Sequence, residues 1–267
     1  MKYKILCSDL DGTLLTTKND VSDFTINEIQ RIKNKLKIVL VSARMPKSML
    51  YLQNRLGVES ELIICYNGAL ILDGQKELLS ITIPHELTKA LFKITKTYKI
   101  KLGLYYKDDW FVSKDSERVQ KEIHHTKAEP VFQETSQTLA NWEKENTGAH
   151  KIMLMGTKTS TDAVFPLLVA ELGDQLHFYR SNDTLIEVAP KKISKLSAIS
   201  TLLKPNESLQ DVIAFGDNYN DMEMLSKVGC GVAVANAREE VKVIANHVTL
   251  KNTENGVAHF IQQHLVI

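Results

Sequence analysis

The sequence has no excess of charge of either sign. Lysine and arginine together number 33, aspartate and glutamate number 32, and the formal net charge is +1. A nearly neutral chain creates no long-range field that would attract nucleic acid or an anionic membrane. We therefore expect neither as a partner, and we expect any anionic ligand to be attracted by groups close to its own binding site.

Long apolar runs and paired cysteines are also missing. No apolar run approaches the roughly 20 residues that span a bilayer, and the first residues carry charge too early for a signal peptide. The three cysteines, Cys7, Cys65 and Cys230, form no Cys-x-x-Cys pair and lie in or beside apolar runs. Buried thiols are therefore expected rather than disulfides or zinc ligands. These features predict a reduced, soluble, cytoplasmic protein.

Short, unbroken apolar runs occur in the N-terminal and C-terminal parts of the chain, with helical patterns between them. These runs occupy residues 5–7, 38–41, 62–65 and 212–215. Strands without a polar face are typical of a parallel sheet that is covered on both sides. The alternation predicts an α/β fold with a doubly wound parallel sheet. In such sheets, ligands bind at the carboxyl ends of the strands.

The pattern changes in the middle of the chain. After an expected hairpin that pairs 69–72 with 78–83 around Asp73-Gly74, strands are predicted at 101–106, 110–113, 151–155, 176–181 and 185–188. Helical patterns lie between them, which suggests an α+β unit. We predict a core formed by residues 1–83 and 188–267, interrupted by an inserted α+β domain at 84–187.

Two acidic residues, Asp9 and Asp11, follow the first apolar run. In an extended chain, their side chains would leave the backbone on the same side. Carboxylates held this close repel one another unless a cation lies between them. Mg²⁺, which prefers oxygen ligands, would satisfy that need. An acidic turn that contains Asp11-Gly12 is the alternative interpretation.

Other polar groups follow the later strands. Ser42 ends the second strand, and its hydroxyl with the backbone N–H groups that follow would suit a phosphate oxygen, with helix capping as the alternative. Asn67 follows the third strand. Asp217, Asn220 and Asp221 follow the fourth, where a capped turn is the alternative.

The string Asp9-Leu10-Asp11-Gly12-Thr13-Leu14 resembles the first motif of the haloacid dehalogenase-type phosphatase superfamily. The resemblance implies that Asp9 is a nucleophile that attacks phosphorus. It also implies that Asp11 is a general acid and base that protonates the leaving oxygen.

Two further segments match later motifs of that family. Ser42 and Ala43 stand where the family holds the phosphoryl group with a hydroxyl and a backbone N–H, and Ala43 replaces the usual glycine. Lys195 matches a lysine that bridges the nucleophile and the phosphoryl oxygens, although Leu196 stands where glycine is common. From the sequence alone, a lysine in a first helical turn is more often a solvated surface charge.

The fourth motif corresponds to Asp217, Asn220 and Asp221. The resemblance implies that Asp217 binds Mg²⁺, that Asn220 contacts phosphate and that Asp221 supports the site. It implies a Mg²⁺ site formed by Asp9, Asp217 and the backbone carbonyl of Asp11.

The long insertion between the second and third motifs resembles the Cof-type sugar-phosphatase branch, whose large cap lies at this point. Asn67, in Asn67-Gly68-Ala69, matches a recurring element of that branch. Arg44 is compatible with a contact to substrate and with a structural salt bridge. In the cap, Tyr105, Trp110, His124 and His125 are candidates for lining the pocket, although such aromatics more often belong to a core.

The resemblance implies a Mg²⁺-dependent hydrolase of small phosphomonoesters, acting through an aspartyl-phosphate, with the cap selecting the leaving group. A phosphomutase on the same core and a non-catalytic sensor of phosphate ligands are the alternatives. We expect a monomer or a weak dimer whose partner is a small-molecule phosphomonoester.

Overall fold

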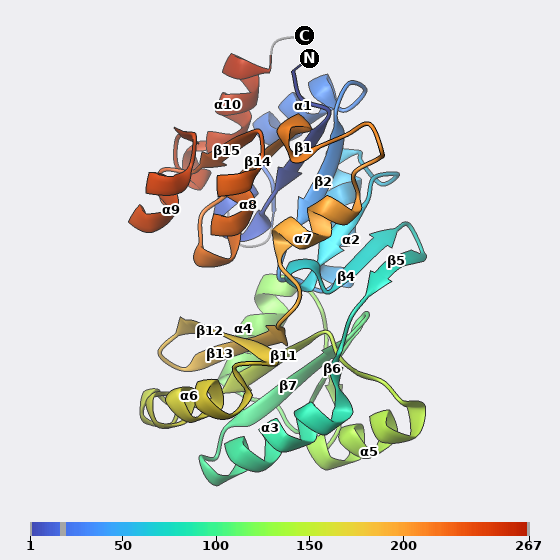
Figure 1. Ribbon diagram of the computed structural model, residues 1–267, viewed down its shortest axis with the longest axis vertical. Helices are drawn as coiled ribbons and strands as arrows, with labels where there is room; N and C mark the ends of the chain where they lie inside the picture. Colours follow the sequence, from blue (N-terminus) through green and yellow to red (C-terminus); the bar gives the residue numbers. More distant parts are fainter. Residues whose placement is uncertain (1, 17–19, 266–267) are drawn as a thin grey trace. The chain divides into compact units, whose positions relative to one another are not determined.

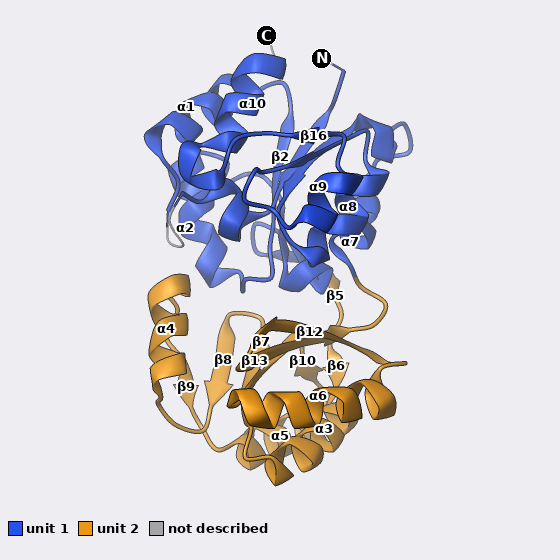
Figure 2. Ribbon diagram, turned by 90° about the vertical axis from the view of Figure 1, so that its left-hand side faces the viewer, with its two compact units in different colours: residues 1–78, 194–267 blue, residues 79–193 orange. Residues whose placement is uncertain are grey.

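A computed structural model describes residues 2–16 and 20–265, and the chain divides into two units (Figure 2). The core unit comprises Met1–Leu78 and Ser194–Ile267, and the inserted unit comprises Leu79–Ile193. These divisions lie a few residues from the boundaries expected at 84 and 187. The reason is that Ile83 and Pro84 pair with Ala149 and Gly148 within the inserted unit, and that its strand β13 continues to Pro190.

The core unit contains a twisted sheet in the order β16-β15-β14-β1-β2-β3-β4-β5 (Figure 1). Its strands are β1 (Ile5–Ser8), β2 (Lys37–Val41), β3 (Ile63–Cys65), β4 (Leu70–Asp73), β5 (Lys76–Ser80), β14 (Val212–Gly216), β15 (Cys230–Ala233) and β16 (His247–Val248). The pairs from β16 to β3 are parallel, whereas β4 runs antiparallel to β3. The predicted α/β class is confirmed, with an antiparallel extension at one edge.

Helices cover both faces of this sheet. They are α1 (Asp23–Ile32), α2 (Lys47–Leu56), α7 (Lys195–Thr201), α8 (Met222–Lys227), α9 (Glu239–Ile244) and α10 (Gly256–His264). Helix α1 packs against α2 and α10 on one face, and α8 packs against α7 and α9 on the other (Figures 1 and 2). Because both faces are covered, strands β1 and β14 are buried along their whole length.

The inserted unit has a six-stranded sheet in the order β12-β13-β11-β7-β8-β9 and a separate β10–β6 pair. Its strands are β6 (Ile83–Pro84), β7 (Lys101–Tyr106), β8 (Asp109–Val112), β9 (Val131–Phe132), β10 (Gly148–Ala149), β11 (Lys151–Met155), β12 (Leu176–Asn182) and β13 (Leu185–Pro190). Its helices are α3 (His85–Thr97), α4 (Glu117–Thr126), α5 (Thr135–Glu145) and α6 (Lys158–Leu172).

Helices α3, α5 and α6 share one apolar core with this sheet. Leu91 of α3, Trp142 of α5 and Leu168 of α6 pack in one cluster with Leu104 and Ile152 of the strands. The side chains that alternate with these point to the other face, where Tyr105 Oη donates a hydrogen bond of 3.4 Å to Glu122 of α4. The inserted unit therefore buries a core of its own.

The expected hairpin forms between β4 and β5, but the bounds of its second strand differ from the prediction. The second strand of the hairpin was expected at 78–83, but β5 occupies Lys76–Ser80. Ile83 is fully buried and pairs with Ala149 instead. A strand pairing between residues so far apart in sequence has no local signal, which explains the error.

The three cysteines are buried and form no disulfide, as the sequence predicted. Across residues 2–16 and 20–265, no helix combines the length and the apolar character needed to cross a bilayer.

Candidate active site

The chain turns sharply after β1. Asp9 is still extended, but a helical turn, η1 (Leu10–Leu14), follows at once, and Gly12 has a φ of 84°. The side chains of Asp9 and Asp11 consequently have different partners, contrary to the expectation that both leave an extended strand on the same side. Asp9 is buried, whereas the side chain of Asp11 is 44% exposed.

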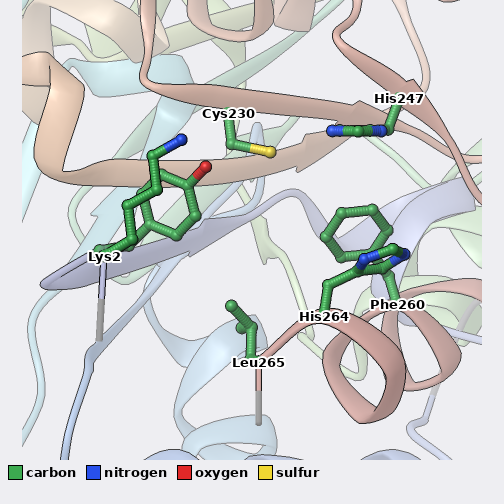
Figure 3. A pocket seen from close by; sticks show the side chains of 7 residues that line it. Lys2, Cys230, His247, Phe260, His264 and Leu265 are labelled. Carbon is green, nitrogen blue, oxygen red and sulfur yellow. The ribbon is translucent and has the colours of Figure 1, made fainter.

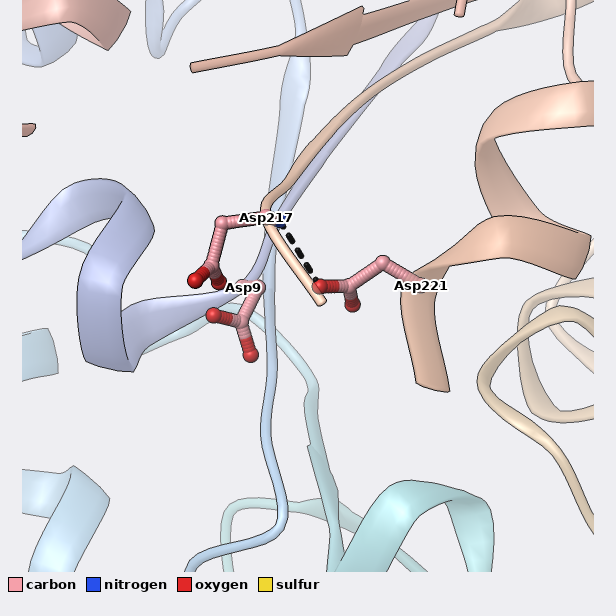
Figure 4. A group of neighbouring side chains, drawn as sticks. All are labelled: Asp9, Asp217 and Asp221. Carbon is pink, nitrogen blue, oxygen red and sulfur yellow. Dashed lines mark hydrogen bonds between the residues drawn. The ribbon is translucent and has the colours of Figure 1, made fainter. Parts of the chain in front are cut away.

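Asp9 forms an acidic cluster with Asp217 and Asp221 instead of with Asp11. One carboxylate oxygen from each of the three lies within 4.8 Å of the others (Figure 4). Asp217 and Asp221 come from the loop after β14, which is the parallel neighbour of β1. Asp221 is fully buried and accepts hydrogen bonds from the backbone N–H groups of Asp217 (2.9 Å) and Asn218 (3.1 Å).

Lys195 supplies the positive charge of this cluster. It opens α7, which is capped by Ser194, and its side chain is buried. Nζ lies 2.5 Å from Asp9 Oδ1 and 2.6 Å from Asp221 Oδ1. The alternative of a solvated surface lysine is therefore wrong, because Lys195 packs into the site while Lys191 and Lys192 remain exposed.

The electrostatics of the cluster follow from its burial. Burial raises the pKa of the Asp9 carboxyl well above its usual value; Lys195 opposes this effect, and the charges of Asp221 and Asp217 add to it. Burial, followed by the charge of Asp221, raises the pKa of Asp217 to about 6. Burial by itself lowers the pKa of Lys195. The carboxylates of Asp221 and Asp9 outweigh burial, so the pKa of Lys195 is raised. One lysine thus faces three carboxyl groups, and a further cation would relieve their repulsion.

Thr13 and Gly12 fix the position of the Asp217 carboxylate. The Thr13 hydroxyl donates a hydrogen bond of 3.0 Å to Asp217 Oδ1, and Thr13 is buried. A Cβ on Gly12 would lie 2.6 Å from Asp217 Oδ2, so the glycine permits this close approach. Thr13 stands inside the first motif, but its contact with Asp217 has no signal in the local sequence.

Ser42, Ala43 and Arg44 form a bend after β2. Ser42 is buried, and its Oγ accepts a hydrogen bond of 3.2 Å from Arg44 N. The sequence pattern indicated that the N–H groups after Ser42 lie at the start of a helix. Helix α2 begins only at Lys47, so these groups belong to a bend instead. Arg44 forms a salt bridge with Asp11, with Nε 2.7 Å from Oδ2.

The side chains of Asn67 and Asn220, which follow β3 and β14, are hydrogen-bonded to one another. Asn220 Nδ2 donates a hydrogen bond of 2.9 Å to Asn67 Oδ1. Asn67 lies in the short turn η2 (Tyr66–Gly68) after β3, with a φ of 56°, and Tyr66 before it has a φ of 53°. Positive φ values at two successive non-glycine residues are unusual and concentrate at functional sites.

The aromatic candidates lie in the inserted unit. The rings of Tyr105 and Trp110 stack with their centroids 5.3 Å apart, and both side chains are buried. His124 and His125 occupy the last turn of α4, with ring centroids 5.6 Å apart. Tyr105 and Trp110 thus help to form the interior of the inserted unit.

A separate cavity of about 290 Å³ lies at the opposite edge of the core sheet (Figure 3). Cys230 and His247, which line it, are the first residues of β15 and β16, and Tyr3 precedes β1. The acidic cluster follows the carboxyl ends of β1 and β14. The acidic cluster, and not this cavity, therefore lies at the carboxyl ends of the strands, where parallel α/β sheets bind their ligands.

The comparisons with known proteins agree with this geometry. Residues 6–261 match the haloacid dehalogenase-like hydrolase family. A Haemophilus influenzae protein that is named only provisionally as a phosphatase is 31% identical over 98% of this chain and 97% of its own length. The 5-amino-6-(5-phospho-D-ribitylamino)uracil phosphatase YitU of Bacillus subtilis is 29% identical, with 98% of each chain covered.

Solved structures show the same likeness. A haloacid dehalogenase-like hydrolase from Bacteroides thetaiotaomicron superposes with a TM-score of 0.88 at 29% identity, covering 98% of this chain and 99% of that one. The chain belongs to the haloacid dehalogenase-like hydrolase family and is an enzyme of the hydrolase class. This confirms the family resemblance, the fold class and the enzyme class that the sequence predicted.

Proposed function

We propose that this enzyme is a Mg²⁺-dependent phosphatase that hydrolyses small phosphomonoesters through an aspartyl-phosphate on Asp9. The observation that carries the proposal is the cluster of Asp9, Asp217 and Asp221, in which Lys195 pairs with Asp9 and Asp221. The names of its relatives, several of which are phosphatases, support the same reaction class.

The donor set suits a hard divalent cation. Carboxylate oxygens are the ligands that Mg²⁺ prefers. Both oxygens of Asp221 already accept hydrogen bonds, from Lys195 and from two backbone N–H groups. Asp9 and Asp217 are therefore the carboxylates that would hold the ion, with the backbone carbonyl of Asp11 as the third ligand proposed. When bound, Mg²⁺ would neutralise charge on the phosphoryl group.

The chain's own residues divide the chemistry into two steps. In the first, an Asp9 carboxylate oxygen bonds to phosphorus, the bond to the leaving oxygen breaks, and Asp11 gives that oxygen a proton to form the alcohol. In the second, water bonds to phosphorus, Asp11 takes a proton from it, and the bond to Asp9 breaks. Phosphate leaves and both aspartates return to their starting states.

The phosphoryl group would be held by the residues around the cluster. We propose that the Ser42 hydroxyl, the backbone N–H of Ala43 and the Asn220 amide donate hydrogen bonds to its oxygens, and that Lys195 balances its charge. In this proposal, Asp221 keeps Lys195 in place and Asn67 orients Asn220.

The inserted unit is proposed to select the leaving group, with sugar phosphates first among the substrates, then pyridoxal phosphate and flavin mononucleotide. We also propose a cytoplasmic protein that is a monomer or a weak dimer; size-exclusion chromatography with light scattering tests the oligomeric state.

The test is phosphate release from a panel of small phosphomonoesters, with Mg²⁺ and with EDTA. We expect release that requires Mg²⁺ and that Asp9→Asn abolishes, because the amide cannot act as the nucleophile. Asp174→Asn, which changes an exposed aspartate of the inserted unit, is the matched control and should keep full activity. Asp9→Asn with wild-type turnover would contradict the proposal. An isomerised sugar phosphate without free phosphate would indicate a mutase, and binding without turnover a sensor.

A further inference from the structure

Arg44 forms a two-point salt bridge with Asp11, outside the acidic cluster. Nε lies 2.7 Å from Oδ2, and Nη2 lies 2.8 Å from Oδ1. Two parallel hydrogen bonds from a planar guanidinium fix both the position and the plane of a carboxylate. Arg44 therefore determines the rotation of the Asp11 side chain about its last bond.

The arginine is the fixed member of this pair. Its side chain is 4% exposed, whereas that of Asp11 is 44% exposed. Arg44 Nη1 donates to the backbone carbonyl of Ser48 (3.3 Å) and to Tyr51 Oη (3.4 Å), both in α2. Helix α2 thus holds the Arg44 guanidinium in place, while the Asp11 carboxylate that it binds remains accessible to solvent.

The backbone of Arg44 is tied to two neighbouring strand ends. Its N–H donates to Ser42 Oγ at 3.2 Å, and its carbonyl accepts a hydrogen bond of 3.1 Å from Tyr66 N. A movement of Arg44 would therefore disturb the loops after both β2 and β3. Asp11, by contrast, lies in η1, whose backbone is irregular at Asp11 and Gly12. Arg44 is therefore the better-anchored partner of the pair.

A stabilising role explains this arrangement poorly. Salt bridges with a solvated partner contribute about 0–1 kcal/mol, and burying a guanidinium has a desolvation cost of its own. Both hydrogen bonds that the described part of the chain gives the Asp11 carboxylate come from Arg44. What the pair does provide is one orientation of a solvent-accessible carboxyl group.

We propose that Arg44 is a positioning residue that holds Asp11 at the angle needed for proton transfer to the leaving oxygen. The inference rests on the proposed phosphatase reaction, in which the leaving oxygen takes the electron pair of the broken phosphorus–oxygen bond and a proton from Asp11. Asp11 enters this step protonated and leaves it as the ionised carboxylate that pairs with Arg44 through both oxygens. Arg44 transfers no proton and contributes by fixing the carboxyl group that does.

The test compares two esters that differ in their need for this proton. An alkyl phosphate has a strongly basic leaving oxygen, whereas 4-nitrophenyl phosphate releases a stable anion with little protonation. The comparison uses kcat/KM, which covers the steps up to departure of the leaving group. For Arg44→Met, we expect kcat/KM to fall about 10²-fold for the alkyl ester and less than about fivefold for the nitrophenyl ester, because positioned proton transfer contributes about 10²–10⁴-fold.

Two further variants separate positioning from folding. Arg31→Met is the control, since Arg31 also pairs with a carboxylate: its Nε (2.9 Å) and Nη2 (2.8 Å) both donate to Oε2 of Glu28. It should leave the ratio of the two kcat/KM values unchanged. Arg44→Lys keeps a charge but loses the planar fork. It should shift the ratio in the same direction as Arg44→Met and by less.

A double-mutant cycle completes the experiment. In an Asp11→Asn background, Arg44→Met should cause no further loss on the alkyl ester, because the group that it positions is absent. Equal losses on both esters, or a further loss in that background, would overturn the positioning role while leaving an active phosphatase. If neither Arg44 variant folds while Arg31→Met does, Arg44 serves the fold and the positioning role is rejected. A wild type that releases no phosphate from any ester contradicts the phosphatase proposal, and this inference with it.

Discussion

The side-chain amide of Asn220 donates a hydrogen bond of 2.9 Å to that of Asn67, although 153 residues separate the two in the sequence. The contact joins the loop after β3 to the loop after β14. Strands β1 and β2 lie between these two strands in the sheet, so the bond joins loops that are not adjacent.

Changing Asn67 to glycine should separate the hydrogen bond from the backbone. Glycine accepts the positive φ of this residue, so Asn67→Gly loses only the hydrogen bond, about 0.5–1.5 kcal/mol. Asn67→Ala should cost about 1–2 kcal/mol more, because a Cβ-bearing residue without a polar group adopts this conformation poorly. Urea unfolding measures both values. Equal stabilities of the two variants would contradict this account.

Removing Lys195 should be severe. Lys195→Met leaves Asp9 and Asp221 buried without their cation, and breaking such a pair costs about 3–5 kcal/mol at neutral pH. Phosphate release should fall to background. The exposed Lys192 provides the control, since Lys192→Met should change the free energy of unfolding by less than about 0.5 kcal/mol. Similar stabilities for Lys195→Met and the wild type would show that the lysine does not balance the carboxylates.

Gly12 and Gly74 form a matched pair for testing close approach. Both have positive φ values, 84° and 57°, but an added Cβ meets Asp217 Oδ2 at 2.6 Å in one case and open space in the other. Gly74→Ala should cost only backbone strain, about 1–2 kcal/mol. Gly12→Ala should also weaken the stabilisation by Mg²⁺, because the Asp217 carboxylate must move. Thermal melts with and without Mg²⁺ measure this, and an unchanged Mg²⁺ response in Gly12→Ala would refute it.

The metal-free protein should lose stability as the pH rises through the range in which Asp217 ionises. The pKa of Asp217 is raised from 3.8 to about 6, chiefly by burial. The folded state thus holds this proton more tightly than the unfolded chain, so its contribution is complete below pH 3.8 and is lost as the pH passes about 6.

Asp217→Asn cannot ionise and should keep the hydrogen bond from Thr13. In EDTA, its thermal midpoint should therefore rise relative to the wild type as the pH increases across this range. The midpoints of both proteins, measured in parallel, give the comparison. A constant difference between them would mean that Asp217 ionises in the folded chain at its ordinary pKa.

The thiols should resist alkylation in the native protein. Burial raises the pKa of the Cys7 thiol to about 12 and also raises that of Cys230, so little reactive thiolate forms at neutral pH. Mass spectrometry after iodoacetamide treatment should show three labelled cysteines in denaturant and none in the native protein over the same period. Rapid native labelling of Cys7 would contradict its burial.

Much of the core could be predicted because its signals are local. The buried strand that leads into Asp9 and the strand that leads into Asp217 each depend on neighbouring residues. In the inserted unit, β7 and β11 have the predicted bounds. The β4–β5 hairpin forms as predicted, but the end of its second strand was misplaced, because Ile83 pairs with β10, which lies more than sixty residues away.

The sequence by itself determined the α/β class, the family and the order of the polar groups that follow the strands, because hydrophobic period and motif spacing are properties of adjacent residues. Only the tertiary structure decided which groups meet. Asp9 lies with Asp217 and Asp221, and Asp11 forms a salt bridge with Arg44. These contacts arise because β14, β1 and β2 are parallel neighbours, so the ends of these strands lie close together. Contacts of this kind depend on sheet register and burial, which no local pattern encodes.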